Sequence, residues 1–174
     1  MRTCDVLIVG GGPGGSTCAR ALARAGADVV VIDRARFPRD KVCAGWVTPG
    51  AFATLQLDPL EYRASGLVLE DLWGFETRGM GGRPVRTTFD RVVSYAIRRC
   101  EFDWFLLQRS GAHIVQGTPL RMIERSGDVW TVNGAWRTPV IVGAGGHFCP
   151  VAQRLWPKPA RGLVVAQEVE LRIP

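Results

Sequence analysis

The fold is decided by the stretch CDVLIVGGGPGG at residues 4–15. Residues 4–9 form a short apolar run that ends at glycine, which is typical of a buried strand in a parallel sheet. Residues 14–25 are rich in alanine and other good helix formers, and Gly26 follows at a natural C-cap position. Residues 28–33 (DVVVID) are dense in β-branched side chains and predict a second strand. A strand, a helix and a strand within about 30 residues have the size of one βαβ unit with a right-handed crossover.

The glycines between the first strand and the helix have the spacing Gly10-x-Gly12-x-x-Gly15, which is typical of dinucleotide-binding proteins. Gly10 lets the chain turn sharply, Gly12 lets bare backbone approach a pyrophosphate, and Gly15 lets the helix pack closely on the sheet. The diphosphate then lies at the helix N-terminus, where free N–H groups and the helix dipole attract negative charge. Asp33 ends the second strand, where its carboxylate can bind ribose hydroxyls and repels the 2′-phosphate of NADP. The pattern predicts a site for the ADP half of FAD or NAD.

The composition narrows the class of protein. The chain has 174 residues, of which 47% are hydrophobic and 22% charged, as in an ordinary soluble domain. The net charge of +6 comes from scattered arginines, which favours an anionic cofactor over nucleic acid. The five cysteines form no C-x-x-C pair, so we expect reduced thiols in a cytoplasmic protein and no metal site. No apolar stretch approaches the roughly 18–20 residues that span a bilayer.

The rest of the chain extends the βαβ unit. An amphipathic helix at residues 100–110 precedes a third parallel strand at 113–116, and a further buried strand at 140–142 runs into a second glycine-rich loop. Turn signals separate three strands of a β-meander, at residues 120–125, 129–132 and 136–138. Helical pieces are expected around residues 51–57. An antiparallel sheet is expected from strands at 67–77, 86–95 and 163–171.

Four blocks of sequence, in this order, resemble the geranylgeranyl reductase-like branch of FAD-dependent oxidoreductases, within the group typified by para-hydroxybenzoate hydroxylase. The blocks are GGGPGG at 10–15, FPRDKVCAG at 37–45, IRRCEFD at 97–103 and VGAGGH at 142–147. The resemblance implies an α/β protein: a Rossmann-like FAD-binding fold with a β-meander, and part of an antiparallel substrate-domain sheet. We expect a discontinuous FAD-binding domain at 1–65 and 97–160, and substrate-domain sheet at 66–96 and 161–174.

The resemblance also implies which residues bind FAD. Arg99 matches the family arginine that reaches the diphosphate, and Leu120 matches the position whose backbone meets the adenine; a surface arginine and a core leucine are the plain alternatives. Cys43 lies in the loop that adjoins the isoalloxazine ring, where a packed thiol is the alternative. The remaining expected contacts are those of the ADP moiety, the ring loop and the second glycine loop: Gly10, Gly12, Pro13, Gly14, Gly15, Asp33, Arg34, Ala44, Gly45, Gly143, Gly145 and Gly146.

Two departures from the family pattern bear on activity. Gly145 stands where many relatives have the aspartate of a G-A-D-G motif, which puts the usual NAD(P)H contact in doubt. His147, next to that loop, is expected to be structural or solvent-facing. The family's later Gly-Asp motif at a strand–helix junction has no counterpart, because Gly127-Asp128 lies in a predicted hairpin turn. The chain is therefore expected to be a fragment or a shortened relative that lacks part of the flavin site.

The leading functional hypothesis is an FAD-dependent oxidoreductase in which NAD(P)H is the transient reductant and the C=C bond of an isoprenoid-like or other apolar substrate is reduced. No side chain need act as a catalytic acid, because the flavin carries the chemistry. The alternatives are an FAD-dependent monooxygenase or halogenase, although no W-x-W motif is present, and a non-catalytic nucleotide-binding remnant. An NAD-dependent dehydrogenase explains only the first 33 residues. Expected partners are a small apolar substrate, a membrane surface reached through a lipid-like substrate and a chain that completes the site, but no nucleic acid.

Overall fold

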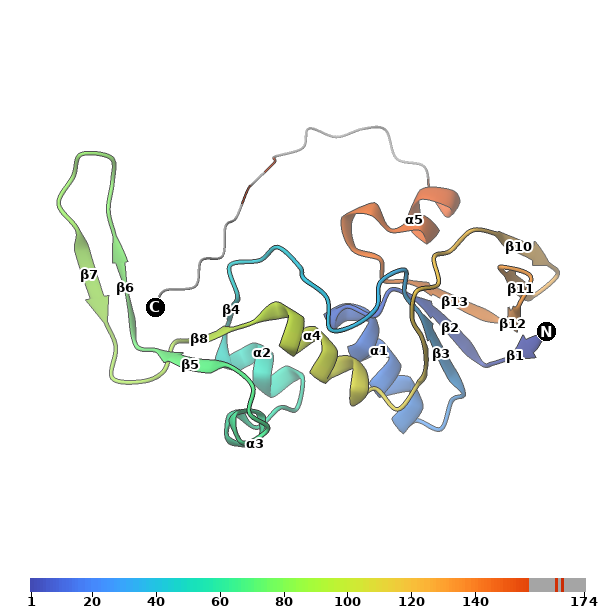
Figure 1. Cartoon of the computed structure of the whole chain (residues 1–174), viewed down its shortest axis with the longest axis horizontal. Helices are drawn as coiled ribbons and strands as arrows, with labels where there is room; N and C mark the ends of the chain where they lie inside the picture. The colour runs from blue at the N-terminus through green and yellow to red at the C-terminus, as the bar shows by residue number, and fades with distance from the viewer. Residues whose placement is uncertain (157–164, 166, 168–174) are drawn as a thin grey trace. The chain divides into compact units, whose positions relative to one another are not determined.

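The computed structural model describes residues 1–156, 165 and 167 of the chain (Figure 1). The backbone divides into two compact units. Of the described residues, the first contains 1–39, 103–156 and 165, and the second contains 40–102 and 167. Both glycine-rich loops belong to the first unit, whereas the loop at residues 43–45 belongs to the second.

A parallel four-stranded sheet, with the strand order β13-β2-β3-β9, forms the centre of the first unit. Helix α1 (Pro13–Arg24) connects β2 to β3. Every residue of β2 and β3 is buried, because a parallel sheet is covered on both faces. The predicted βαβ unit and both further parallel strands are confirmed, but the expected burial of the strand at 140–142 is wrong, because β13 is an edge strand with no buried residue. The strands are β2 (Val6–Val9), β3 (Val29–Ile32), β9 (His113–Val115) and β13 (Val140–Gly143).

Alternate residues of β2 and β3 enter two different hydrophobic cores, as the two-residue period of a strand requires. Val6, Ile8, Val29 and Val31 pack with residues of α1 and α4 (Arg99–Gln108) on one side of the sheet. The other side carries the second core, which joins the sheet to the meander and to α5 (Pro150–Leu155). Its buried members are Cys4, Leu7, Val9, Val30, Ile32, Leu120, Val132, Trp136, Cys149 and Val151. The sheet therefore has a fixed place between two apolar layers, with its strand ends left for the loops.

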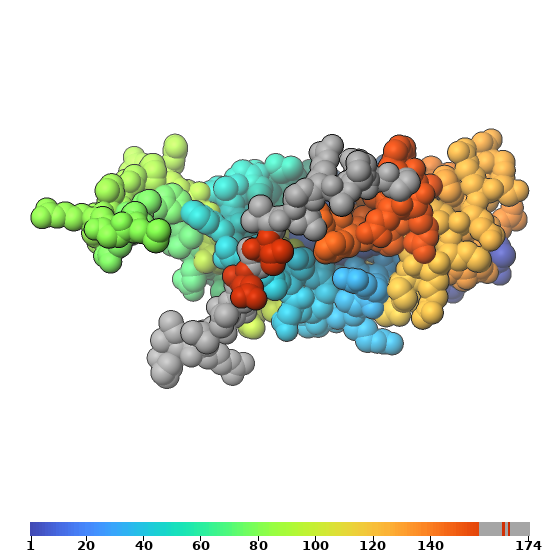
Figure 2. All heavy atoms as spheres, turned by 90° about the horizontal axis from the view of Figure 1, so that it is seen from above, coloured from blue at the N-terminus to red at the C-terminus, as the bar shows by residue number. Residues whose placement is uncertain are grey.

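The β-meander has the expected antiparallel order and one strand that the sequence pattern missed. Its strands are β10 (Ile123–Ser126), β11 (Val129–Val132) and β12 (Trp136–Thr138). The missed strand is β1 (Arg2–Thr3), which pairs in parallel with β12. Figure 2 shows the consequence: the N-terminal residues, in blue, lie beside the yellow and orange atoms of the meander.

The first meander strand begins at Ile123, three residues later than the pattern predicts. The reason is Asn133 in the β11–β12 turn, whose side-chain oxygen accepts hydrogen bonds from the backbone N–H groups of Arg121 (2.7 Å) and Met122 (3.0 Å). Those N–H groups are bound to a side chain and do not enter the strand ladder. Asn133 and Gly134 both have positive φ, 52° and 63°, as an Asn-Gly hairpin turn requires.

The second unit contains an antiparallel sheet with the order β4-β8-β5 and a separate ribbon of β6 and β7. The predicted strands at 67–77 and 86–95 are each two strands, so these two predictions were wrong about continuity. The break lies opposite Trp73, where the segment from Phe89 to Val93 bulges out of the pairing. The N–H of Phe89 donates to the Trp73 carbonyl, and the N–H of Val93 donates to the Leu72 carbonyl. The strands are β4 (Trp46–Val47), β5 (Leu69–Leu72), β6 (Gly74–Thr77), β7 (Val85–Thr88) and β8 (Ser94–Ile97).

Aromatic side chains form the core of the second unit. The ring of Phe52 lies 4.9 Å from that of Tyr95 and 5.9 Å from that of Phe102, which also packs on Tyr62. Phe52 comes from the expected helix α2 (Pro49–Thr54), and Tyr62 comes from α3 (Pro59–Ala64), which the pattern missed. Asp58 caps α3, and a proline follows at the first helical position, so the start signal was present in the sequence.

After β13 the chain forms a short 3₁₀ turn, η1 (Gly146–Phe148), and the unforeseen helix α5. The predicted strand at 163–171 lies outside the described residues, apart from residues 165 and 167, which are in no strand. Within the described part of the chain, no helix combines the length and the apolar character needed to cross a membrane.

Candidate dinucleotide site

Two glycine-rich loops meet at the carboxyl edge of the parallel sheet. Strand β2 has β3 on one side and β13 on the other, so the loops that leave β2 and β13 start from neighbouring strands. The chain leaves β2 towards β3 through α1, while β13 arrives on the opposite side. In open α/β sheets this reversal of strand order is where ligands bind. The architecture therefore places the candidate site in front of residues 10–15 and 143–146.

Gly10 and Gly15 are required by the packing of the loops themselves. Gly10 has a φ of +113°, and a Cβ on it would lie 2.5 Å from the carbonyl oxygen of Ala144. A Cβ on Gly15 would collide with the carbonyl oxygen of Gly10 and lie 3.2 Å from the Cβ of Ala144. The Ala144 N–H also donates to the Val9 carbonyl at 2.8 Å. The tight turn and the close helix packing anticipated for these two glycines are both present.

Gly12 and Gly14 differ, because the protein leaves the space in front of them open. Among the described residues, a Cβ on Gly12 would meet only the guanidinium of Arg39, at 3.6 Å, and one on Gly14 would meet nothing within 4 Å. Gly12 is the N-cap of α1, and no described side chain caps that helix. Its first N–H groups therefore face open space, as an anion-binding helix start requires. This bare cradle fits the diphosphate of a dinucleotide.

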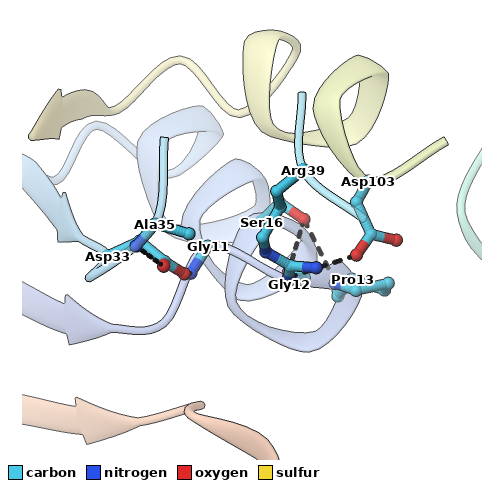
Figure 3. A network of polar contacts seen from close by, with 8 residues as sticks. All are labelled: Gly11, Gly12, Pro13, Ser16, Asp33, Ala35, Arg39 and Asp103. Carbon is cyan, nitrogen blue, oxygen red and sulfur yellow. Dashed lines mark hydrogen bonds and ion pairs between the residues drawn. The ribbon is translucent and has the colours of Figure 1, made fainter. Parts of the chain in front are cut away.

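Asp33 ties the glycine loop to the end of β3 (Figure 3). Its Oδ2 accepts a hydrogen bond from the N–H of Gly11 at 2.7 Å, and its Oδ1 accepts one from the N–H of Ala35 at 2.8 Å. Sequence reasoning missed this role. Each carboxylate oxygen has a second lone pair, so the expected contact with the ribose hydroxyls stays a prediction.

The second glycine loop is packed against the start of α5. A Cβ on Gly143 would lie 2.8 Å from the Sγ of Cys149. A Cβ on Gly145 would lie 3.0 Å from the ring of Pro150 and 3.1 Å from the Cα of Cys149. An aspartate at position 145 would therefore need the 149–150 turn to move, which explains why glycine stands there. Gly146 has a φ of +74° and open space around it in the described structure.

The comparisons with known proteins agree with this geometry. Residues 5–99, more than half of the chain, match the model of the family described as FAD dependent oxidoreductase. The chain belongs to this family. Its match includes the first glycine loop, Asp33 and the loop at residues 43–45.

Two curated relatives are reductases. The chain is 60% identical over 52 residues to menaquinone reductase of Mycolicibacterium smegmatis, a match to 30% of this chain and 13% of that protein. It is 32% identical over 137 residues to digeranylgeranylglycerophospholipid reductase 1 of Methanothermobacter thermautotrophicus, covering 74% of this chain and 34% of that protein. The resemblance to geranylgeranyl reductase-like flavoproteins is thus confirmed. The chain spans about a third of the length of the digeranylgeranylglycerophospholipid reductase, and a smaller share of the menaquinone reductase.

A solved structure extends the likeness to a different reaction class. The flavin-dependent halogenase CmlS has a TM-score of 0.68 and 26% identity, over 89% of this chain and 31% of the halogenase. The expected α/β fold with a Rossmann-type FAD-binding part is confirmed. This halogenase therefore shares the arrangement of strands and loops seen in the chain, while the two curated relatives named above are reductases.

The other expected contacts are distributed over both units. In the first unit Arg34 is exposed beside Asp33, and Leu120 is 8% exposed in the core under the meander. His147 is exposed, as expected, with its ring centroid 4.7 Å from that of Phe148. Pro13, at the first position of α1, fixes the helix start. These placements leave the FAD contacts of Arg34 and Leu120 as predictions.

The second unit holds the expected ring loop and Arg99. Gly45 has a φ of +66°, and a Cβ on it would collide with the carbonyl oxygen of Ile97, so glycine is needed where β8 pairs with this loop. Cys43 is half-buried and Ala44 is exposed. Arg99 is the first residue of α4 and is half-buried. Their roles at the flavin also remain predictions.

One pair of residues in the first unit was not foreseen. The NH2 of Arg39 lies 3.3 Å from Oδ2 of Asp103, a side chain with no exposed surface. Arg39 comes from the FPRDKVCAG block and Asp103 from the IRRCEFD block. The presence of both blocks indicates the family, but neither block by itself predicts an ion pair between Arg39 and Asp103.

Proposed function

We propose that this chain binds FAD, with the diphosphate at the N-terminus of α1 and the adenosine towards the end of β3. The observation that carries the proposal is the space at Gly12. The packing of the described residues requires glycine at positions 10 and 15, but it gives no reason for glycine at position 12. A ligand that must touch bare backbone supplies that reason. Family membership selects FAD over NAD as the ligand.

We further propose that the protein is an oxidoreductase that reduces C=C bonds of isoprenoid-like or other apolar substrates, with NAD(P)H as reductant. Support comes from the two curated relatives, which are named as reductases of menaquinone and of digeranylgeranylglycerophospholipid, a lipid whose name states two geranylgeranyl chains. Bound FAD would supply the two-electron chemistry. The described residues would bind and orient it: the glycine loop at the diphosphate, and Asp33 by holding that loop in shape.

An FAD-dependent monooxygenase or halogenase is the second candidate, and the likeness to the halogenase CmlS favours it. Gly145 also bears on the choice, because the glycine offers no carboxylate for the family's nucleotide contact and a larger residue would need the 149–150 turn to move. The reductant would then meet other groups. A nucleotide-binding chain without catalysis is the third candidate, and it shares the cradle at Gly12.

The expected surroundings follow from the same proposal. The substrate would be small and apolar, and a lipid-like substrate would bring the protein to a membrane surface. A further chain would complete the substrate side of the site. The cytoplasm is the proposed location, supported by Cys4, Cys18, Cys100 and Cys149, which are free thiols as a reducing compartment requires.

The decisive experiment measures FAD and ADP binding by titration calorimetry and flavin absorbance. Gly12→Val should abolish both, because its side chain enters the diphosphate space. Gly79→Val is the matched control, since Gly79 lies in the second unit with nothing of the described protein within 4 Å of its Cβ position. Equal binding by wild type and Gly12→Val would refute the placement. ADP binding without retained flavin would favour the non-catalytic candidate.

The requirement for O₂, and the incorporation of labelled oxygen into the product, distinguish a reductase from a monooxygenase. A reductase should convert its substrate under anaerobic conditions with one NAD(P)H per C=C bond. A monooxygenase should require O₂ and place one labelled oxygen atom from ¹⁸O₂ in the product. Label in the product would overturn the reductase proposal in favour of the second candidate.

A further inference from the structure

The guanidinium of Arg39 lies beside the open cradle of the glycine loop. Its NH2 is 3.6 Å from the position that a Cβ on Gly12 would occupy, nearer than any other described atom. Figure 3 shows Arg39 close to the start of α1, with its dashed contact running to Asp103. The arginine therefore adjoins the space in which the diphosphate is proposed to lie.

Three neighbours hold the guanidinium in place. Asp103, fully buried on α4, pairs with NH2 at 3.3 Å. The Arg39 Cζ lies 4.6 Å from the centroid of the Phe37 ring, and that ring stacks on Trp104 with a centroid distance of 6.1 Å. Asp103 and Trp104 are consecutive residues of α4, so one helix supports both the charge and the ring under Arg39. Such support fixes an arginine before a ligand arrives, which lowers the entropy lost on binding.

Arg39 nevertheless has a donor for a ligand, because its NH2 group carries two N–H bonds and the single contact with Asp103 Oδ2 uses one of them. Its NH1 is buried and has no hydrogen-bond partner among the described residues. Because NH1 has no accessible surface, a ligand in the open cradle would meet NH2 and not NH1. A guanidinium offers a planar fork of N–H donors that matches phosphate oxygens. An acceptor of phosphate type in front of Gly12 would therefore complete the contacts of NH2.

We propose that Arg39 binds the diphosphate of the dinucleotide through the second N–H of its NH2 group, and that Asp103 is a positioning residue that holds this group. The inference rests on the proposed FAD function and adds a side chain to a site otherwise built from backbone. It also gives the FPRDKVCAG and IRRCEFD blocks a joint purpose, because each contributes one half of the ion pair. A purely structural ion pair between the loop after β3 and α4 is the competing account.

Titration of the full chain with ADP and with adenosine separates the two accounts. Arg39→Gln should weaken ADP binding roughly 10- to 100-fold, the range for losing a hydrogen bond to a charged group. It should leave adenosine binding unchanged, and the salt dependence of ADP binding should become shallower. Arg39→Lys should recover part of the ADP affinity, because it keeps the charge and loses the fork. Arg125→Gln, an exposed arginine on β10, is the control for lost charge.

Asp103→Asn tests the positioning role without removing Arg39. It should reduce ADP affinity, leave adenosine affinity unchanged and make Arg39→Gln less harmful in the double variant, because the two residues act through one contact. Equal losses of affinity for ADP and adenosine, or an Arg39→Gln affinity for ADP within twofold of wild type, would overturn this role of Arg39 without contradicting the proposed FAD function. A wild-type chain that binds neither ADP nor FAD would instead refute the proposed function.

Discussion

Replacing Asp33 by asparagine tests whether this carboxylate is a structural clasp as well as a candidate ribose ligand. In the structure its two oxygens accept hydrogen bonds from Gly11 N–H at 2.7 Å and Ala35 N–H at 2.8 Å. Asparagine keeps one acceptor and turns a donor towards the other N–H. Hydrogen bonds to charged groups contribute about 1.5–3 kcal/mol each, so losing one should lower the free energy of unfolding by about 2 kcal/mol. This loss should appear without any ligand present.

Urea denaturation followed by tryptophan fluorescence measures the loss. With a slope of about 2 kcal/mol per molar, the midpoint for Asp33→Asn should fall by about 1 M. Asp128→Asn is the matched control, because Asp128 is fully exposed and its nearest ion-pair contact, to Arg125, is 3.7 Å long. Its midpoint should stay within about 0.2 M of wild type. A midpoint for Asp33→Asn as high as that of the control would show that Asp33 does not hold the glycine loop.

Two further variants probe the first unit. Gly10→Ala should cost on the order of 3 kcal/mol in unfolding free energy, because a φ of +113° and a carbonyl oxygen 2.5 Å from the new Cβ both oppose it; a denaturation midpoint equal to wild type would contradict the loop geometry. Burial raises the pKa of the Cys4 thiol above its ordinary value of 9.0. The thiol therefore stays protonated to a higher pH in the folded state than in the unfolded state. The free energy of unfolding accordingly falls as the pH rises above about 9. Cys4→Ala should flatten the decline in urea midpoint between about pH 8 and 10, whereas an unchanged slope would assign the decline to other groups.

Much of the first unit follows from local sequence patterns. The apolar runs at residues 6–9 and 29–32 become fully buried parallel strands, and Gly26 ends the connection after α1 with a φ of +89°. Asn133-Gly134 forms its turn with two positive φ angles. These features are predictable because a period of two, a helix start and a positive φ are properties of consecutive residues.

The second unit was harder to predict because its strands depend on their partners. A single strand is predicted over residues 67–77, but the chain changes partner at Trp73, where the opposite segment bulges between Phe89 and Val93. A bulge arises when one strand has more residues than the strand it pairs with. A local sequence pattern does not contain this information, because the partner strand lies elsewhere in the chain. Helix α3 is a different case. Its start signal, Asp58-Pro59, is visible in the sequence, but the helix has only six residues, which is too short to show a helical period of apolar residues.

The glycine turn at residues 10–15, between a buried strand and a helix, is predictable from the residue types, because glycine permits the positive φ of Gly10 and has no Cβ. The packing of Gly10 and Gly15 against Ala144, the hydrogen bond from Gly11 to Asp33 and the ion pair of Arg39 with Asp103 became known from the folded structure. The physical reason is that hydrogen bonds and ion pairs join residues by distance in space. That distance is set by how β13 and α4 pack on the sheet, and no stretch of consecutive residues encodes it.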